Sequence, residues 1–155
     1  MMEKRIITDL TEMDLFAADV VNQLTAQAKA TILLLNGDLG VGKTTFVQAV
    51  ARYLGVTDMV TSPTFVIQKN YHTQHTVFSE LVHIDAYRLE SGAEVDVLRI
   101  AEQCNNPSVL LCIEWGSRIA DVLPSTHMYT IDFAITSDEH RVVQITPPGS
   151  NNSKS

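Results

Sequence analysis

The feature that most constrains the fold is a glycine-rich loop at residues 36–46, with the sequence NGDLGVGKTTF. It matches G-x-x-x-x-G-K-[ST] in full, from Gly37 to Thr44. The apolar run TILLLN precedes the loop, and KTTFVQAVARYLG follows it with the pattern of a helix that ends at Gly55. A strand, such a loop and a helix in that order are typical of a phosphate-binding loop.

Each part of this motif has a physical reason. Glycines allow consecutive backbone N–H groups to point toward an anion without a Cβ in the way, and the following helix adds its unpaired N–H groups and its dipole. Lys43 supplies a point charge for the β- and γ-oxygens, the Thr44 hydroxyl can ligate Mg²⁺, and Thr45 can reach the α-phosphate. The loop therefore predicts a nucleotide, but it does not predict the reaction.

The remaining pattern predicts helices and strands around this loop. We expect a first helix that opens at Thr11, with Asp14 three residues on as a near capping box. Its apolar face would consist of Met13, Ala17, Val20, Val21, Leu24 and Ala28. Strands are expected at 31–36, 77–85 and 108–115, and a turn followed by a strand at 62–71. A helix is expected at 93–103, and a terminal hairpin from HMYTIDFAIT and RVVQIT. The predicted fold is an α/β, P-loop NTPase-like mixed sheet with a parallel centre, helices on both faces and antiparallel hairpin edges.

Size and charge limit the function classes. The 155 residues suit a single domain, expected at 1–147, followed by a polar tail at 148–155 that we expect to be disordered. The net charge of −7 argues against a protein that binds nucleic acid or an anionic membrane on its own, because such proteins need a basic surface. The two cysteines form no C-x-x-C pair, which favours a reducing compartment. With no signal peptide and no membrane-length apolar run visible, we expect a cytoplasmic protein.

Two acids at strand ends are candidates for holding a metal ion or a water molecule. Asp85 ends the segment LVHID and Glu114 ends VLLCIE, and P-loop enzymes place an acid at the end of a second buried strand. The pattern leaves open which acid ligates Mg²⁺ and which positions the water; either could instead be a solvated or helix-capping carboxylate. Thr64 in SPTF is a candidate sensor of the γ-phosphate and Mg²⁺, or else a strand-start threonine fixed by Pro63.

Two side chains beside these acids each have two interpretations. His83 lies two residues before Asp85 and shares its strand face, so it either orients that carboxylate or is a core histidine. Trp115, the only tryptophan, either packs in the core or forms a contact surface beside Glu114.

Four segments in this order and at this spacing resemble one bacterial family. GDLGVGKTTF, SPTF, HIDAYRL and IEW are similar to the ATPase of tRNA threonylcarbamoyladenosine biosynthesis, the TsaE family (formerly YjeE), over roughly Thr8 to Thr146. The first segment is shared by countless NTPases, whereas SPTF and HIDAYRL are much more specific. The resemblance implies a small domain that binds ATP and Mg²⁺, hydrolyses ATP slowly alone, and works with a threonylcarbamoyl transferase and its paralogous partner. Their joint product is the modified adenosine beside the anticodon of tRNAs that read ANN codons, and tRNA is contacted only through the complex.

The resemblance also assigns nucleotide-binding residues. It implies that the phosphates are held by Gly37, Asp38, Leu39, Gly40, Val41, Gly42, Lys43, Thr44 and Thr45. Arg141 matches a nucleotide-contacting arginine, and the segment around Leu10 and Thr11 is implied to lie near the adenine.

For the metal and the chemistry, the resemblance assigns Mg²⁺ to Thr44 and Glu114, with Asp85 and Thr64 in the other functional motifs. Asp85 stays a second candidate metal ligand, because the residues alone do not separate the two acids.

Two positions depart from the family pattern. Arg99 stands where a glycine is usual, and Gly116 stands where proline or serine often follows the E-W pair. Both lie on segments expected to face a partner.

Two other classes of nucleotide-binding protein stay open. A small-molecule kinase needs an acceptor pocket and usually an arginine-bearing lid, and no lid insertion is evident. A nucleotide-gated binding module would bind nucleotide without releasing phosphate. A GTPase is disfavoured because no N-K-x-D segment occurs.

Overall fold

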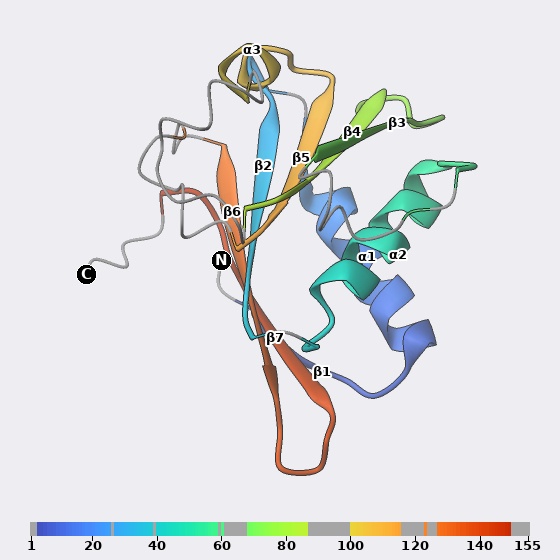
Figure 1. Cartoon of the computed structure of the whole chain (residues 1–155), viewed down its shortest axis with the longest axis vertical. Helices are drawn as coiled ribbons and strands as arrows, with labels where there is room; N and C mark the ends of the chain where they lie inside the picture. The colour runs from blue at the N-terminus through green and yellow to red at the C-terminus, as the bar shows by residue number, and fades with distance from the viewer. Residues whose placement is uncertain are drawn as a thin grey trace.

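A computed structural model describes residues 3–25, 27–38, 40–58, 60, 68–86, 100–115, 123 and 127–149 (Figure 1). Its elements in chain order are β1 (Glu3–Ile7), α1 (Leu10–Gln23), β2 (Thr31–Asn36), α2 (Lys43–Leu54), β3 (Gln68–His72), β4 (Glu80–Asp85), α3 (Ile100–Cys104), β5 (Val109–Glu114), β6 (Met128–Ile135) and β7 (Arg141–Thr146). Across this part of the chain the strands form one seven-stranded sheet in the order β1-β7-β6-β2-β5-β4-β3.

The sheet has a parallel centre and antiparallel edges. β2 runs parallel to both β5 and β6, and β4 runs parallel to β5. The outer pairs β3–β4, β6–β7 and β1–β7 are antiparallel. The predicted mixed sheet is therefore confirmed. Because parallel strands end at the same edge, the carboxyl ends of β2, β4 and β5 bring the loop and both candidate acids together.

The central strand β2 is apolar from Ile32 to Leu35, as expected of a strand whose two faces are both covered. Leu33 and Leu35 pack in the core beneath α1 and α2, which lie together on one side of the sheet (Figure 1). Ile32 and Leu34 pack in a second core on the opposite face, to which α3 contributes Cys104. β2 is therefore packed on both faces, and this packing fixes the position at which the loop begins.

Aromatic packing fixes α2, the helix that carries the end of the loop. Phe46 of α2 lies 5.5 Å from Phe16 of α1 and 5.8 Å from Phe133 of β6, measured between ring centroids. All three side chains are buried, and such contacts contribute beyond the apolar area they bury. The N-terminus of α2 is therefore held from both a helix and a strand.

The N-terminal region differs from the prediction. The sequence pattern gave no strand before the first helix, whereas β1 pairs along β7, with Ile7 opposite Arg141. The helix begins at Leu10 rather than Thr11, because Asp9 is its N-cap and accepts a hydrogen bond from the Glu12 N–H at 2.8 Å. A carboxylate at this position satisfies a helix donor that would otherwise be unpaired.

The Glu12 carboxylate completes the cap by accepting from the Thr8 N–H at 2.6 Å. The capping pair is therefore Asp9 with Glu12, not Thr11 with Asp14.

The other elements follow the predicted order. β2 and β7 have the predicted bounds and α2 ends before Gly55 as predicted, whereas two strands are shorter than expected. The second strand expected at 77–85 is Glu80–Asp85, and the one expected at 108–115 is Val109–Glu114. The predictions at 62–71 and 93–103 lie partly outside the described residues. No helix in the described part of the chain is long and apolar enough to cross a membrane.

Candidate functional site

The glycines of the loop have backbone conformations that L side chains rarely adopt. The φ angles are +146° at Gly37, +80° at Gly40 and +109° at Gly42. At Gly37 space is also limiting, because a Cβ would lie 2.7 Å from the Phe133 carbonyl oxygen and 2.8 Å from Val41 Cγ2. At Gly40 nothing lies within 4 Å of such a Cβ. The loop is therefore pressed against β6 at its start and open at its tip.

Lys43 is buried at the base of this loop, with only 4% of its surface exposed. Its ammonium donates hydrogen bonds to the carbonyl oxygens of Gly37 and, at 3.3 Å, of Asp38. Burial lowers the pKa of Lys43, while the carboxylates of Glu114, Asp85 and Asp38 oppose that shift. A desolvated cation whose oxygen partners among the described residues are two loop carbonyls is well placed to exchange them for phosphate oxygens.

The two candidate acids lie side by side at the sheet edge. Asp85 of β4 is directly opposite Glu114 of β5 in the parallel register, and both are buried. The Thr44 hydroxyl donates a hydrogen bond of 2.8 Å to Glu114 Oε2. A hydroxyl and a carboxylate in contact are oxygen ligands of the kind Mg²⁺ uses, with its remaining positions filled by water and by nucleotide phosphates.

His83 is a core histidine, as one of its two interpretations predicted, and it also contacts a carboxylate. It is fully buried, and its Nε2 lies 2.6 Å from Glu114 Oε2. The sequence pattern suggested Asp85 as its carboxylate partner, because His83 and Asp85 share a strand face. The bond to Glu114 crosses to the neighbouring strand instead, which no pattern along β4 alone could predict.

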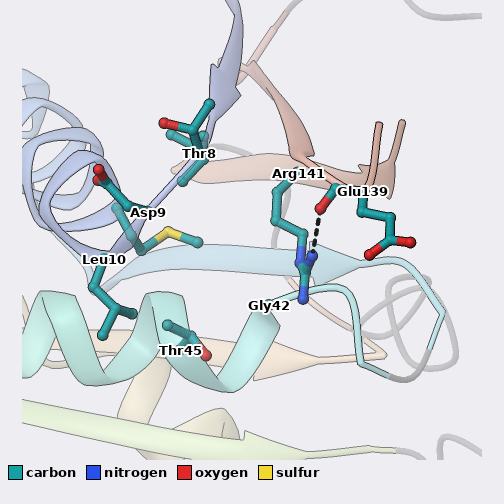
Figure 2. Close-up of a pocket in the computed structure, with 9 residues that line it drawn as sticks. Thr8, Asp9, Leu10, Gly42, Thr45, Glu139 and Arg141 are labelled. Atoms are coloured by element: carbon teal, nitrogen blue, oxygen red, sulfur yellow. Dashed lines mark hydrogen bonds between the residues drawn. The ribbon is translucent and has the colours of Figure 1, made fainter. Parts of the chain in front are cut away.

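Beside the loop is a cavity of about 230 Å³ between the β1–α1 junction and the start of β7 (Figure 2). Its lining residues are Ile7, Thr8, Asp9, Leu10, Met13, Gly42, Thr45, Glu139 and Arg141. Arg141 donates to the carbonyl oxygens of Gly40 at 3.2 Å and Glu139 at 3.3 Å. The cavity thus opens directly onto the loop, at the end nearest the first turn of α2.

The expected adenine-side residues are only partly brought to this cavity. Leu10, Thr45 and Arg141 line it, whereas Thr11 does not and is exposed on α1. Thr8 and Asp9 were not predicted as cavity residues, because β1 was not predicted. The D-x-x-E spacing of Asp9 and Glu12, a capping signal, could have placed the helix start and found them.

Several residues named from the sequence lie outside the described residues. Leu39 of the loop, Thr64 of SPTF, and the two departures Arg99 and Gly116 are in this group. Their assignments stay predictions. The described loop residues Gly37, Asp38, Gly40, Val41, Gly42, Lys43, Thr44 and Thr45 all lie between β2 and the first turn of α2.

Comparisons with known proteins agree on one family. The model of the family described as "Threonylcarbamoyl adenosine biosynthesis protein TsaE" matches residues 7–143. Similar curated proteins, each called "tRNA threonylcarbamoyladenosine biosynthesis protein TsaE", include those of Treponema pallidum and Rickettsia bellii. The first is 33% identical over 76% of this chain and 82% of that protein. The second is 37% identical over 74% of this chain and 76% of that protein.

A solved structure is similar as well. The crystal structure of YdiB from Bacillus subtilis has a TM-score of 0.74 and 30% sequence identity, and the match covers 96% of this chain and 87% of that one. The family match spans most of the sequence, including the loop, both strand-end acids and Arg141. The chain therefore belongs to the TsaE family of threonylcarbamoyl adenosine biosynthesis proteins.

Proposed function

We propose that this protein is a Mg²⁺-dependent ATPase that supports a threonylcarbamoyl transferase in making N6-threonylcarbamoyladenosine in tRNAs that read ANN codons. The observation that carries the proposal is the contact between Thr44 and Glu114 at the base of a complete phosphate-binding loop, in a chain of the TsaE family. ATP hydrolysis drives or resets the transferase complex; this chain does not itself transfer the threonylcarbamoyl group.

ATP would bind with its phosphates in the loop and its nucleoside toward the cavity. The loop offers backbone N–H groups, the dipole of α2 and the Lys43 ammonium. The cavity beside Leu10 and Thr45 adjoins the loop through Gly42. Adenine is proposed rather than guanine because the sequence has no N-K-x-D segment.

Mg²⁺ would be held by Thr44 and Glu114, with Asp85 close by. These residues fit the ion, since a hydroxyl and two carboxylates meet at one sheet edge beside the phosphate loop. The ion supplies charge neutralisation on the phosphates when it is bound. Asp85 lies next to Glu114 and is the better candidate to orient the attacking water, since Glu114 is the acid bonded to Thr44.

ATP binding would replace the hydrogen bonds that Lys43 makes within the loop. Lys43 would give up the carbonyl oxygens of Gly37 and Asp38 for phosphate oxygens. The new hydrogen bonds join two charged groups, and such bonds are stronger than bonds to neutral carbonyls.

The charge of the protein suits a role beside a tRNA-binding partner. A protein with a net charge of −7 is not suited to bind the negatively charged phosphate backbone of tRNA directly. We propose that the transferase and its paralogous partner hold the tRNA in the cytoplasm and that this chain contacts it only through them.

The test is a reconstitution with the transferase, its paralogous partner, tRNA, ATP and Mg²⁺. Phosphate release and the modified nucleoside are measured together, with Glu114→Gln as the site variant and Asp58→Asn, an exposed carboxylate after α2, as the matched control. We expect wild type and Asp58→Asn to show partner-stimulated release and modification, and Glu114→Gln to show neither. Phosphate transfer to a small acceptor would indicate a kinase instead. Tight binding without release, even with partners, would indicate a nucleotide-gated binding module.

A further inference from the structure

His83 and Glu114 form a buried pair directly behind the candidate metal site. His83 Nε2 and Glu114 Oε2 are 2.6 Å apart, and His83 is 0% exposed. His83 lies on β4 opposite Cys112, two positions before Asp85 meets Glu114 across the strands. The histidine therefore reaches the acid of the neighbouring strand diagonally, from inside the core.

The partner of His83 indicates which of its ring nitrogens donates. A carboxylate oxygen accepts hydrogen bonds, so Nε2 is the nitrogen that carries hydrogen in this pair. The other ring nitrogen, Nδ1, is buried and has no hydrogen-bond partner among the described residues. A buried ring that leaves one nitrogen unpaired is costly, so its bond to Glu114 is the polar contact that accounts for a histidine at this place.

Two donors meet on one oxygen of Glu114. The Thr44 hydroxyl and His83 Nε2 both bond to Oε2, and neither of these bonds uses Oε1. Thr44 belongs to the loop and to the proposed metal site, whereas His83 is enclosed in the sheet and cannot touch a nucleotide. The two hydrogen bonds together hold Oε2 in place before any ligand arrives.

We propose that His83 is a positioning residue, which holds the Glu114 carboxylate through Nε2 in the orientation that receives Mg²⁺. The inference rests on the proposed function, since it assumes that Glu114 is a metal ligand. Outer-shell groups of this kind orient metal ligands, and their loss typically weakens metal affinity by about 10–100-fold.

The chain offers a matched pair of variants to test this role. In His83→Gln the amide nitrogen reaches about as far as Nε2, and in His83→Asn it stops near the position of Nδ1. Both are amides of similar polarity, so a general loss of packing affects them alike, whereas only glutamine keeps the donor at Glu114. ATP affinity is measured calorimetrically in EDTA and in Mg²⁺, and the ratio of the two affinities reports the contribution of the metal.

We expect the wild-type ratio in His83→Gln and a ratio reduced by about tenfold in His83→Asn, with affinity in EDTA unchanged in both. A wild-type ratio in His83→Asn overturns the inference, as does an equal loss in both variants. If His83→Asn loses as much ATP affinity in EDTA as it loses in Mg²⁺, His83 has a purely structural role and the inference is wrong. If the wild-type protein itself binds ATP equally with and without Mg²⁺, the proposed metal site fails before His83 is tested, so the two failures are distinguishable.

Discussion

The Lys43 ammonium lies 3.8 Å from the centroid of the Trp115 ring. Trp115 directly follows Glu114, and its backbone N–H donates to the Leu35 carbonyl oxygen at 3.0 Å. The indole is thus fixed to the strand that leads into the loop, while its face is occupied by the cation that the loop would offer to a phosphate. A cation on a ring face is attracted by the ring quadrupole, with a gain of about 0.5–2 kcal/mol.

Nucleotide binding is therefore expected to change the environment of Trp115. Phosphate oxygens carry full charge and attract the ammonium more strongly than a ring face does. We expect the emission maximum of Trp115, the only tryptophan, to shift as MgATP is added, with the same midpoint as a calorimetric titration. Lys43→Ala should have a shifted maximum without nucleotide and should not respond further. Unchanged wild-type emission at saturating MgATP would mean that Lys43 stays on the ring.

The loop and the strands around it were predictable because their signals are local. The order of glycines before Lys43 predicts a strand before the loop and a helix after it. The apolar run that precedes the loop predicts a strand that is buried on both faces. Asp85 and Glu114 could be named because each ends such a run. Parallel strands place their ends at one edge, so the two acids had to be near the loop.

The contacts across strands were not predictable in the same way. The sequence left His83 as either a partner of Asp85, on the same strand face, or a core histidine. The diagonal hydrogen bond to Glu114 depends on the register of β4 against β5. β1 was missed because its five residues, EKRII, mix charges with isoleucines, so no alternation shows which face is buried. Its pairing with β7 comes from a strand more than a hundred residues away, and no local pattern carries that information.

The two glycines Gly37 and Gly40 should respond differently to the same substitution. Gly37→Ala combines an unfavourable φ with a Cβ 2.7 Å from backbone, whereas Gly40→Ala has the unfavourable φ alone. We expect a loss in free energy of unfolding of about 1–2 kcal/mol at Gly40 and about 1–3 kcal/mol more at Gly37. Urea unfolding of both variants gives the comparison. Equal losses would show that β6 does not press on the start of the loop.

ATP binding should take up protons at alkaline pH. Burial holds the pKa of Lys43 below its ordinary value in the free protein, and bound phosphates would raise it because they favour the charged form. At a pH between the pKa of Lys43 in the free protein and its higher pKa in the complex, ATP binding adds a proton to Lys43. ATP affinity therefore falls as the pH rises above the pKa of the free protein.

Calorimetry in two buffers of different ionisation enthalpy measures this uptake directly. Lys43→Arg is the control, because its guanidinium stays charged throughout and should show no uptake from this site. Equal uptake in the two proteins would assign the proton to another group.

Arg141 is expected to act on the loop rather than only on the nucleoside. Its guanidinium donates to the Gly40 carbonyl oxygen, which joins β7 to the tip of the loop, and its side chain also lines the cavity (Figure 2). Arg141→Ala removes that link, so it should weaken binding of both ATP and inorganic tripolyphosphate by about tenfold, or about 1.4 kcal/mol. Arg52→Ala makes the same change on α2, where the guanidinium pairs with exposed Asp14 away from the cavity, and should leave both affinities unchanged. If Arg141→Ala weakens ATP but not tripolyphosphate, the arginine contacts the nucleoside and the loop keeps its shape without it.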